Sequence, residues 1–239
     1  MITRSRTLKK NINDIMFEAI NNGDIEGLKR AFEEEANVYA EDKNGNQPLH
    51  IAVKNGNLKI AELLTDEYGA DVDEKNAEGK SPLHLAVEQY DMEMSSLLLE
   101  LLGADVDVRD RNGETPLYYA LRNGDLDIIK LLVEDYDADL NIENIYGHTP
   151  FNIAFEKNNV QAIGIISNMG GNVMIDAKIS PLTYVLMSDN NIKYEIAKEI
   201  LKYSDVNEVV DGLTALDNLE SVGLKNEVDF LVQNGASKF

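Results

Sequence analysis

The sequence has no cysteine, no long apolar run and few basic residues, and each absence excludes a class of protein. Without cysteine the chain can form neither a disulfide framework nor a cysteine-ligated zinc or iron–sulfur site, which suits a reducing, cytoplasmic location. No apolar run approaches the roughly 18 residues of a membrane span. The basic start is followed by a segment too polar for a signal peptide. We interpret residues 1–12 as a flexible basic arm, the alternative being an anchor for an anionic partner.

Basic residues number 22 against 43 acidic ones, which gives a formal net charge of −21. Phosphate binding needs a basic face that releases counterions, so the balance disfavours nucleic acid as a partner. It disfavours anionic membrane for the same reason, and it favours solubility and a basic partner. We therefore expect neither nucleic acid nor membrane among the partners.

Four segments of the chain repeat one pattern. DKNGNQPLHIAVKNGN at 42–57 returns as NAEGKSPLHLAVEQYD at 76–91, as DRNGETPLYYALRNGD at 110–125 and as NIYGHTPFNIAFEKNN at 144–159. Their prolines are spaced 34 residues apart, at Pro48, Pro82, Pro116 and Pro150. A fixed period of this length indicates a stack of repeated supersecondary units.

Each unit predicts a tight turn followed by two helices. A glycine supplies the positive φ of the turn, at Gly45, Gly79, Gly113 and Gly147. Ser81, Thr115 and Thr149 stand where a helix N-cap belongs, and proline follows at the first helical position. A short apolar helix then ends at Asn-Gly or an equivalent, and a second helix carries apolar residues at helical spacing.

This pattern, with PLH in two units and GADV at the end of two, resembles the ankyrin repeat family. The resemblance implies an all-α solenoid of about seven helix-turn-helix repeats joined by β-turn tips, with capping repeats at both ends. We expect a single domain over 13–239, whose capping repeats leave no room for a second one. Its predicted boundaries are 13–41 (N-cap), 42–75, 76–109, 110–143, 144–174, 175–207 and 208–239 (C-cap).

The chain departs from the family pattern in two places. The central units have 34 residues rather than the usual 33, and the extra residue falls at the end of the second helix. Between Asn172 and Pro181 the unit is two residues short and lacks the turn glycine, whereas about three extra residues follow Val185. We expect residues 168–192 to be the least regular part and less protected in hydrogen exchange than 48–132.

No motif in the sequence predicts catalysis. GKS at 79–81 lacks the earlier glycine of a phosphate-binding loop, since Glu74 stands in that place. The acidic segment 135–146 lacks the glycine and the final glutamate of a calcium loop. His50 and His84 have no second ligand beside them, and the resemblance implies that they join neighbouring turns. We expect no enzyme activity, no cofactor and no metal.

The resemblance implies a concave binding face made of turn tips and first helices. All three arginines after Arg30 fall on variable positions of that face in one repeat, and lysines precede them in the repeat before. Exposed apolar residues follow on the next tip, which is typical of an interface centre. The predicted partner-binding residues are Lys75, Lys80, Arg109, Arg111, Asn112, Tyr118, Arg122, Ile145, Tyr146 and His148.

Two alternatives remain open for these residues. The arginines could balance Asp105, Asp107, Asp110 and Glu114 in surface ion pairs worth about 0–1 kcal/mol each. Ile145 and Tyr146 could pack on an adjacent turn. Tyr118 could substitute for the usual histidine, with Tyr119 in the core, although either side chain could lean into the binding face.

The sequence thus favours a monomeric cytoplasmic module that binds another protein. The alternative is a structural or assembly scaffold that contacts basic partners through an acidic convex surface. An adaptor delivered into a host cytosol is also open, and an enzyme or its targeting domain is the weakest hypothesis. The fold indicates the mode of binding but not the target.

Overall fold

A computed structural model describes residues 11–171 and 180–237 of the chain. The described residues form helices joined by turns and loops, with no β-strand among them. Their contacts divide the chain into two compact units, Met1–Asp105 and Val106–Phe239. In neither described range is a helix long and apolar enough to cross a membrane.

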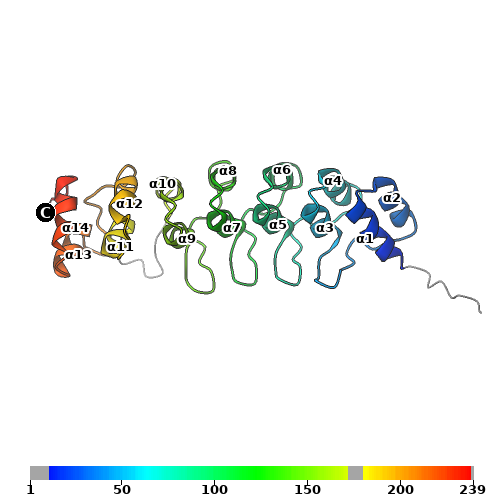
Figure 1. Cartoon of the computed structure of the whole chain (residues 1–239), viewed down its shortest axis with the longest axis horizontal. Helices are drawn as coiled ribbons and strands as arrows, with labels where there is room; N and C mark the ends of the chain where they lie inside the picture. Colours follow the sequence, from blue (N-terminus) through cyan, green and yellow to red (C-terminus); the bar gives the residue numbers. More distant parts are fainter. Residues whose placement is uncertain (1–10, 172–179, 238–239) are drawn as a thin grey trace, which may run out of the picture. The chain divides into compact units, whose positions relative to one another are not determined.

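The first unit is built from helix pairs (Figure 1). The first helices of successive pairs, α1, α3 and α5, pack side by side, and each also packs on the second helix of its own pair. The last second helix continues into a π-helical turn, η1. The bounds are α1 (Ile12–Asn22), α2 (Ile25–Glu33), α3 (Pro48–Lys54), α4 (Leu58–Asp66), α5 (Pro82–Glu88), α6 (Met92–Ser96) and η1 (Leu97–Leu101).

The second unit repeats the arrangement. Helix α7 packs on α9, α10 packs on both α8 and α12, and α11 packs on α13. The bounds are α7 (Pro116–Asn123), α8 (Leu126–Lys130), η2 (Leu131–Asp135), α9 (Pro150–Glu156), α10 (Val160–Asn168), α11 (Pro181–Met187), α12 (Lys193–Ile200), α13 (Ala215–Ser221) and α14 (Lys225–Gln233).

The core lies between the helices of each unit. Leu49, Leu83 and Leu117 come from the second helical position of three first helices and are completely buried. Leu64 and Leu98 from second helices are buried equally. Each repeat therefore contributes apolar residues from both of its helices, and burial of this kind drives the packing of neighbouring repeats.

The first helices begin where the sequence predicts. Ser81, Thr115 and Thr149 are the N-cap residues of α5, α7 and α9, with proline at the first helical position of each. Helix α1 begins at Ile12 after the N-cap Asn11, one residue before the predicted start of the first repeat. The Asn11 side chain accepts a hydrogen bond from the Asn13 amide, as an N-cap residue does.

The extra residue of the 34-residue units lies in the last turn of the second helix, as predicted. In these units an alanine amide closes the helix by donating to a carbonyl six residues earlier: Ala70 to Leu64, Ala104 to Leu98 and Ala138 to Leu132. In three other repeats the closing bond spans five residues: Ala36 to Ala31, Gly171 to Ile166 and Ala236 to Leu231. The π-helical turns η1 and η2 occupy this place in two of the three longer units.

The loop between α11 and α12 is longer than its counterparts. It contains residues 188–192, whereas residues 89–91 alone separate α5 from α6. The added length is thus two residues on this comparison, rather than about three. Lys193 closes the loop by donating to the carbonyls of Leu186 and Ser188, and its Nζ lies 2.8 Å from a carboxylate oxygen of Glu227. The shortened segment predicted before Pro181 falls on residues 172–179, outside the described residues.

Candidate functional site

Side-chain hydrogen bonds close two turn tips of the second unit. The Asp110 carboxylate accepts hydrogen bonds from the backbone amides of Asn112 and Glu114, at 2.8 and 2.9 Å. The Asn144 side chain accepts from the amides of Tyr146 and His148 in the same way, both at 3.0 Å. Such side-chain bonds fix the turn and leave the side chains at its outer positions pointing away from the helices.

Backbone and side-chain bonds tie these two tips together. The Ile145 amide donates to the Asn112 carbonyl at 2.8 Å, and the Asn144 side-chain amide donates to Glu114 at 3.1 Å. The structure therefore brings Asn112 and Ile145 together, with Arg111 and Tyr146 as their neighbours in sequence.

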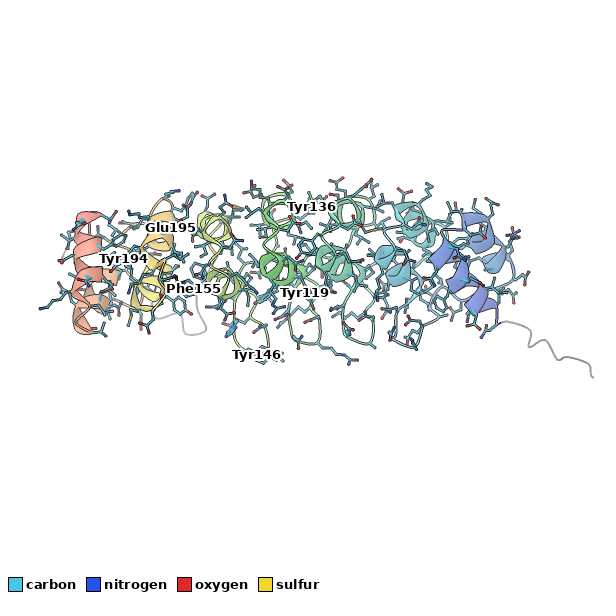
Figure 2. All side chains as sticks on the ribbon, viewed as in Figure 1. Tyr119, Tyr136, Tyr146, Phe155, Tyr194 and Glu195 are labelled. Carbon is cyan, nitrogen blue, oxygen red and sulfur yellow. The ribbon has the colours of Figure 1, made fainter. Side chains whose placement is uncertain are left out.

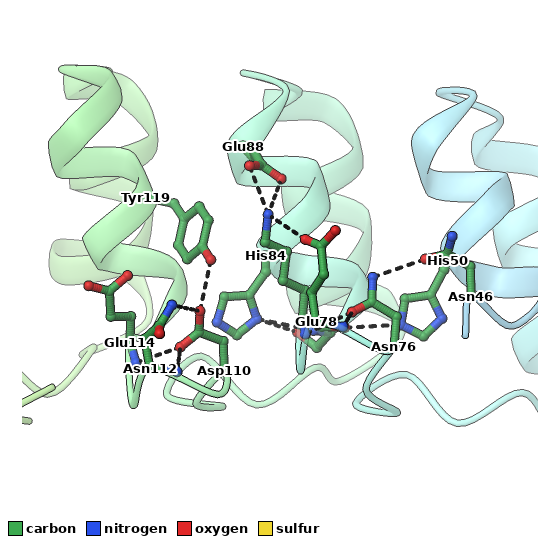
Figure 3. Close-up of polar contacts among 12 residues, drawn as sticks. Asn46, His50, Asn76, Glu78, His84, Glu88, Asp110, Asn112, Glu114 and Tyr119 are labelled. Atoms are coloured by element: carbon green, nitrogen blue, oxygen red, sulfur yellow. Dashed lines mark hydrogen bonds and ion pairs between the residues drawn. The ribbon is translucent and has the colours of Figure 1, made fainter. Parts of the chain in front are cut away.

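The first unit uses the same bonds. The Ala77 amide donates to the Asn44 carbonyl at 3.2 Å, and the Asn76 side chain donates to Asn46 at 2.9 Å (Figure 3). A Cβ atom on Gly45 would lie 2.7 Å from the Ala77 amide nitrogen, so only glycine fits where the tips approach.

Ile145 and Tyr146 are exposed at 62% and 67% of their surface. Figure 2 shows Tyr146 at the end of its turn, away from the helices. Its hydroxyl has no hydrogen-bond partner in the part of the chain that the structure describes. This exposure disfavours the alternative that both side chains pack on an adjacent turn.

Two of the three arginines have structural partners. Arg109 donates to the carbonyls of Gly113 at 3.1 Å and Glu143 at 2.7 Å, so it links its own tip to the next repeat. Arg122 holds the buried carboxylate of Glu114 with both terminal nitrogens, one of them at 2.6 Å. The alternative that an arginine forms an ion pair with Glu114 thus holds for Arg122. Arg109 instead donates hydrogen bonds to backbone carbonyls.

The Arg122 guanidinium is fixed from two sides. It lies 5.8 Å from the ring centre of Tyr119, and the Tyr119 hydroxyl donates to Asp110 at 2.9 Å. The hydrogen bond to Glu114 raises the pKa of Arg122 above its usual value. This ion pair leaves Arg122 little free charge for a partner, although two fifths of its side chain is exposed.

Arg111 differs from both. Its side chain is exposed and makes no hydrogen bond or ion pair with any other residue that the structure describes. Of the three arginines, Arg111 is the one available to a partner.

Tyr118 is not a partner contact, which corrects its place among the predicted residues. Its side chain is completely buried, and its hydroxyl lies 2.5 Å from the carbonyl oxygens of Ile142 and His148. In the first unit His50 makes the corresponding contact, with its Nε2 3.1 Å from the Lys80 carbonyl oxygen. Tyr118 thus substitutes for the histidine, as the alternative interpretation held. Burial raises the pKa of Tyr118 and lowers that of His50.

The predicted lysines belong to the first unit. Lys80 is mostly buried, with its Nζ 3.1 Å from Glu78 and 2.8 Å from Glu88 (Figure 3). Burial opposes its charge, but these carboxylates raise its pKa above the usual value. Lys75 is exposed. Because the arginines lie in the other unit, a basic stripe that joins all of them stays a prediction.

The remaining predicted residues frame the tips of the second unit. Asn112 is exposed, and its own side-chain amide lies 3.4 Å from Asp110. His148 is half-buried, with its Nδ1 3.8 Å from Glu156. Three of the predicted residues in the second unit are exposed and make no side-chain hydrogen bond or ion pair with the described residues; we call Arg111, Ile145 and Tyr146 the tip patch.

Sequence reasoning missed exposed apolar residues in other loops. Tyr90 stands in the loop before α6 with a φ of 60°, and Val209 and Leu213 lie on the turn before α13. A signal for Tyr90 was present, since VEQYD aligns with VKNGN and puts Tyr90 where the earlier repeat has Gly56.

Among the residues that the structure describes, no three histidine, aspartate or glutamate side chains are grouped to hold a metal ion. A family model described as Ankyrin repeats (3 copies) matches residues 15–110 and, in a second match, residues 90–177. None of the curated proteins compared with the chain matches it. The two family matches cover well over half of the sequence and agree with the helix pairs and turns of both units. The chain belongs to the ankyrin repeat family.

Proposed function

We propose that the chain is a non-catalytic module that binds a polypeptide partner through the tip patch. Ankyrin repeats generally mediate protein–protein interaction, and the family is typically non-catalytic. The observation that carries the proposal is the pair of exposed apolar side chains, Ile145 and Tyr146, on a turn closed by hydrogen bonds to Asn144. Rigid exposed aromatic groups lose little entropy on binding and are enriched at interface centres.

The chemistry of the tip patch indicates what the partner must present. Arg111 carries an unpaired guanidinium, whose planar fork suits a carboxylate. Ile145 and Tyr146 call for an apolar group beside that carboxylate. The partner surface is therefore an acidic residue next to an apolar anchor on another protein. We further propose that the module acts as a monomer in the cytoplasm and binds neither nucleic acid nor membrane.

A capture experiment from lysate of the source cell tests this function. The wild-type chain is compared with the double variant Arg111→Ala/Tyr146→Ala and with the control variant Tyr39→Ala, which removes another exposed tyrosine. We expect a protein that the wild type and the control retain and the double variant loses. With that protein purified, each single change should weaken binding by about 10- to 100-fold without changing the unfolding midpoint.

Arg122→Ala separates binding from folding in the same assay. It removes the cation that pairs with the buried Glu114 carboxylate, so it should lower stability more than Arg111→Ala and weaken binding less. Equal recovery of the partner by wild type and double variant would move the interface away from the tip patch. Binding that fades with salt and ignores the tip variants would instead favour the acidic scaffold.

A further inference from the structure

Tyr90 has a backbone conformation that tyrosine rarely adopts. Its φ is 60°, and the corresponding residue is glycine in four other repeats: Gly23, Gly56, Gly124 and Gly223. In a fifth, Asn158 takes a φ of 54°, and asparagine tolerates this region better than most other side chains. A large aromatic residue at this place costs stability that glycine would not cost.

The Tyr90 side chain gains little burial in return. It is 58% exposed, and Met92 beside it is 40% exposed. An aromatic ring that adds strain and still faces solvent is poorly explained by folding alone. Tyrosine and methionine together form a surface that adapts to an apolar or cationic side chain.

The surroundings of Tyr90 are acidic. No lysine or arginine occurs between Lys80 and Arg109, whereas Glu88, Asp91 and Glu93 flank the tyrosine. Asp91 is used as the N-cap of α6, where it accepts from the Met94 amide at 2.9 Å. The Glu93 side chain is exposed and makes no hydrogen bond or ion pair within the described ranges. The loop and the first turn of α6 therefore carry an exposed aromatic ring, a thioether and a carboxylate within four consecutive residues.

We propose that Tyr90, Met92 and Glu93 form a second docking surface, which binds an arginine or lysine beside an aliphatic residue on a partner protein. The cation stacks on the Tyr90 ring and pairs with Glu93, and the aliphatic group contacts Met92. This surface lies in the first unit and prefers a basic partner, whereas the tip patch in the second unit prefers an acidic one. An experiment that contradicts one of the two proposals therefore leaves the other unaffected.

The test uses the full chain and two synthetic peptides, acetyl-Leu-Arg-Leu-Arg-Leu-amide and the matched peptide with glutamate in place of arginine. Amide chemical shifts of the ¹⁵N-labelled protein are followed at physiological ionic strength, which screens long-range attraction to the acidic chain. We expect the arginine peptide to shift the amides of residues 89–94 and the glutamate peptide to leave them unchanged. Tyr90→Phe should bind like the wild type, and Tyr90→Gly should bind at least tenfold more weakly.

Tyr90→Gly should also raise the melting temperature by about 2–4 °C, because it relieves the left-handed strain. Asn158→Gly is the matched control, since it changes the same loop position in another repeat and should leave peptide binding unaltered. Equal binding by Tyr90→Gly and the wild type would overturn the proposal, as would shifts spread over the whole acidic surface. A fall in melting temperature would refute the argument from strain. Tyr146→Ala should bind the arginine peptide normally, whichever way the proposed function is decided.

Discussion

At the scale of residues, the side chain at the third position of a first helix can make two hydrogen bonds. One goes to the N-cap residue of its own helix and the other to the turn of the next repeat. His50 does both: its Nδ1 accepts from the Gln47 amide at 3.2 Å, and its Nε2 reaches the Lys80 carbonyl. Asn152 serves the N-cap, accepting from the amide and hydroxyl of Thr149 at 2.8 and 3.1 Å. Tyr118 makes the link to the next turn but has no acceptor near the N-cap.

This difference leaves a buried hydroxyl group near Tyr118 without a hydrogen bond in the part of the chain that the structure describes. The hydroxyl of Thr115, the N-cap of α7, is buried and has no hydrogen-bond partner among the described residues. A buried hydroxyl without a partner loses its hydration and recovers nothing in exchange. The substitution of tyrosine for histidine thus costs its own repeat while preserving contact with the following one.

A matched pair of substitutions measures this cost. Thr115→Val removes the unsatisfied hydroxyl, so we expect the free energy of unfolding to stay unchanged or to rise by up to about 1 kcal/mol. Thr149→Val removes a hydroxyl bonded to Asn152 and should cost about 1 kcal/mol. Urea unfolding of both variants gives the two values. A greater loss at Thr115 than at Thr149 would contradict the assignment.

The sequence predicts which of the arginines are exposed better than it predicts their hydrogen-bond partners. Repeat alignment predicts that Arg109, Arg111 and Arg122 lie on one surface, because the position within a repeat determines whether a residue lies on a turn or on an exposed part of the first helix. It does not show that Arg122 finds the buried Glu114 or that Arg109 finds backbone carbonyls. Those pairings depend on which acceptors lie within reach, and that information requires the folded turn.

At the scale of elements, the one extra residue of each 34-residue unit widens the last turn of its second helix. In the shorter units, the backbone amide after the second helix donates a hydrogen bond to the carbonyl five residues earlier. In the longer units it donates to the carbonyl six residues earlier. The spacing of the prolines predicts the excess, and the apolar pattern places it after the buried part of the second helix. It does not predict that η1 and η2 become π-helical, because that depends on local hydrogen bonding.

Deletion of Leu101 tests whether the wide turn is needed. This residue is 70% exposed at the end of η1, and its removal restores the five-residue closure without moving Leu98 or Leu99. We expect the variant to fold with a free energy of unfolding within about 1 kcal/mol of the wild type. Deletion of Leu98 is the control, and it should cost about 3 kcal/mol or more because it draws Glu100 toward a buried position. Comparable losses from both deletions would show that the wide turn is itself required.

At the scale of the whole molecule, the excess of acidic residues acts on stability. The formal charge of −21 leaves many carboxylates without a basic neighbour, and their repulsion is larger in the compact chain than in the unfolded one. Salt shortens the range of that repulsion. Surface ion pairs such as Lys59 with Glu62 are exposed and offset little of it.

We therefore expect added salt to stabilise the chain. Raising sodium chloride from about 0.02 M to about 0.5 M should raise the urea midpoint at neutral pH, because screening weakens the repulsion between carboxylates. The same change near the isoelectric point, a pH of about 4.4, should give no such gain. A midpoint that falls with salt at neutral pH would mean that ion pairs outweigh repulsion in this molecule.

The repeated architecture itself could be read from the sequence, because proline, glycine and cap residues recur at one spacing and each has a local cause. The division of contacts into two units could not, since the 34-residue period continues from Pro82 to Pro116 across the boundary at Asp105. Contacts within a solenoid are local, so small differences between neighbouring interfaces decide where it divides.

The alternation of Asp42, Asn76, Asp110 and Asn144 at the turns has a consequence for how such a chain can be rearranged. Asn76 and Asn144 each donate a side-chain hydrogen to the preceding tip, at Asn46 and Glu114, and a carboxylate cannot do this. A repeat that opens with asparagine can be transplanted behind any tip that offers an oxygen. The side chain of a repeat that opens with aspartate can only accept hydrogen bonds, so gene duplication would conserve the pattern of donated bonds best by copying repeats in pairs.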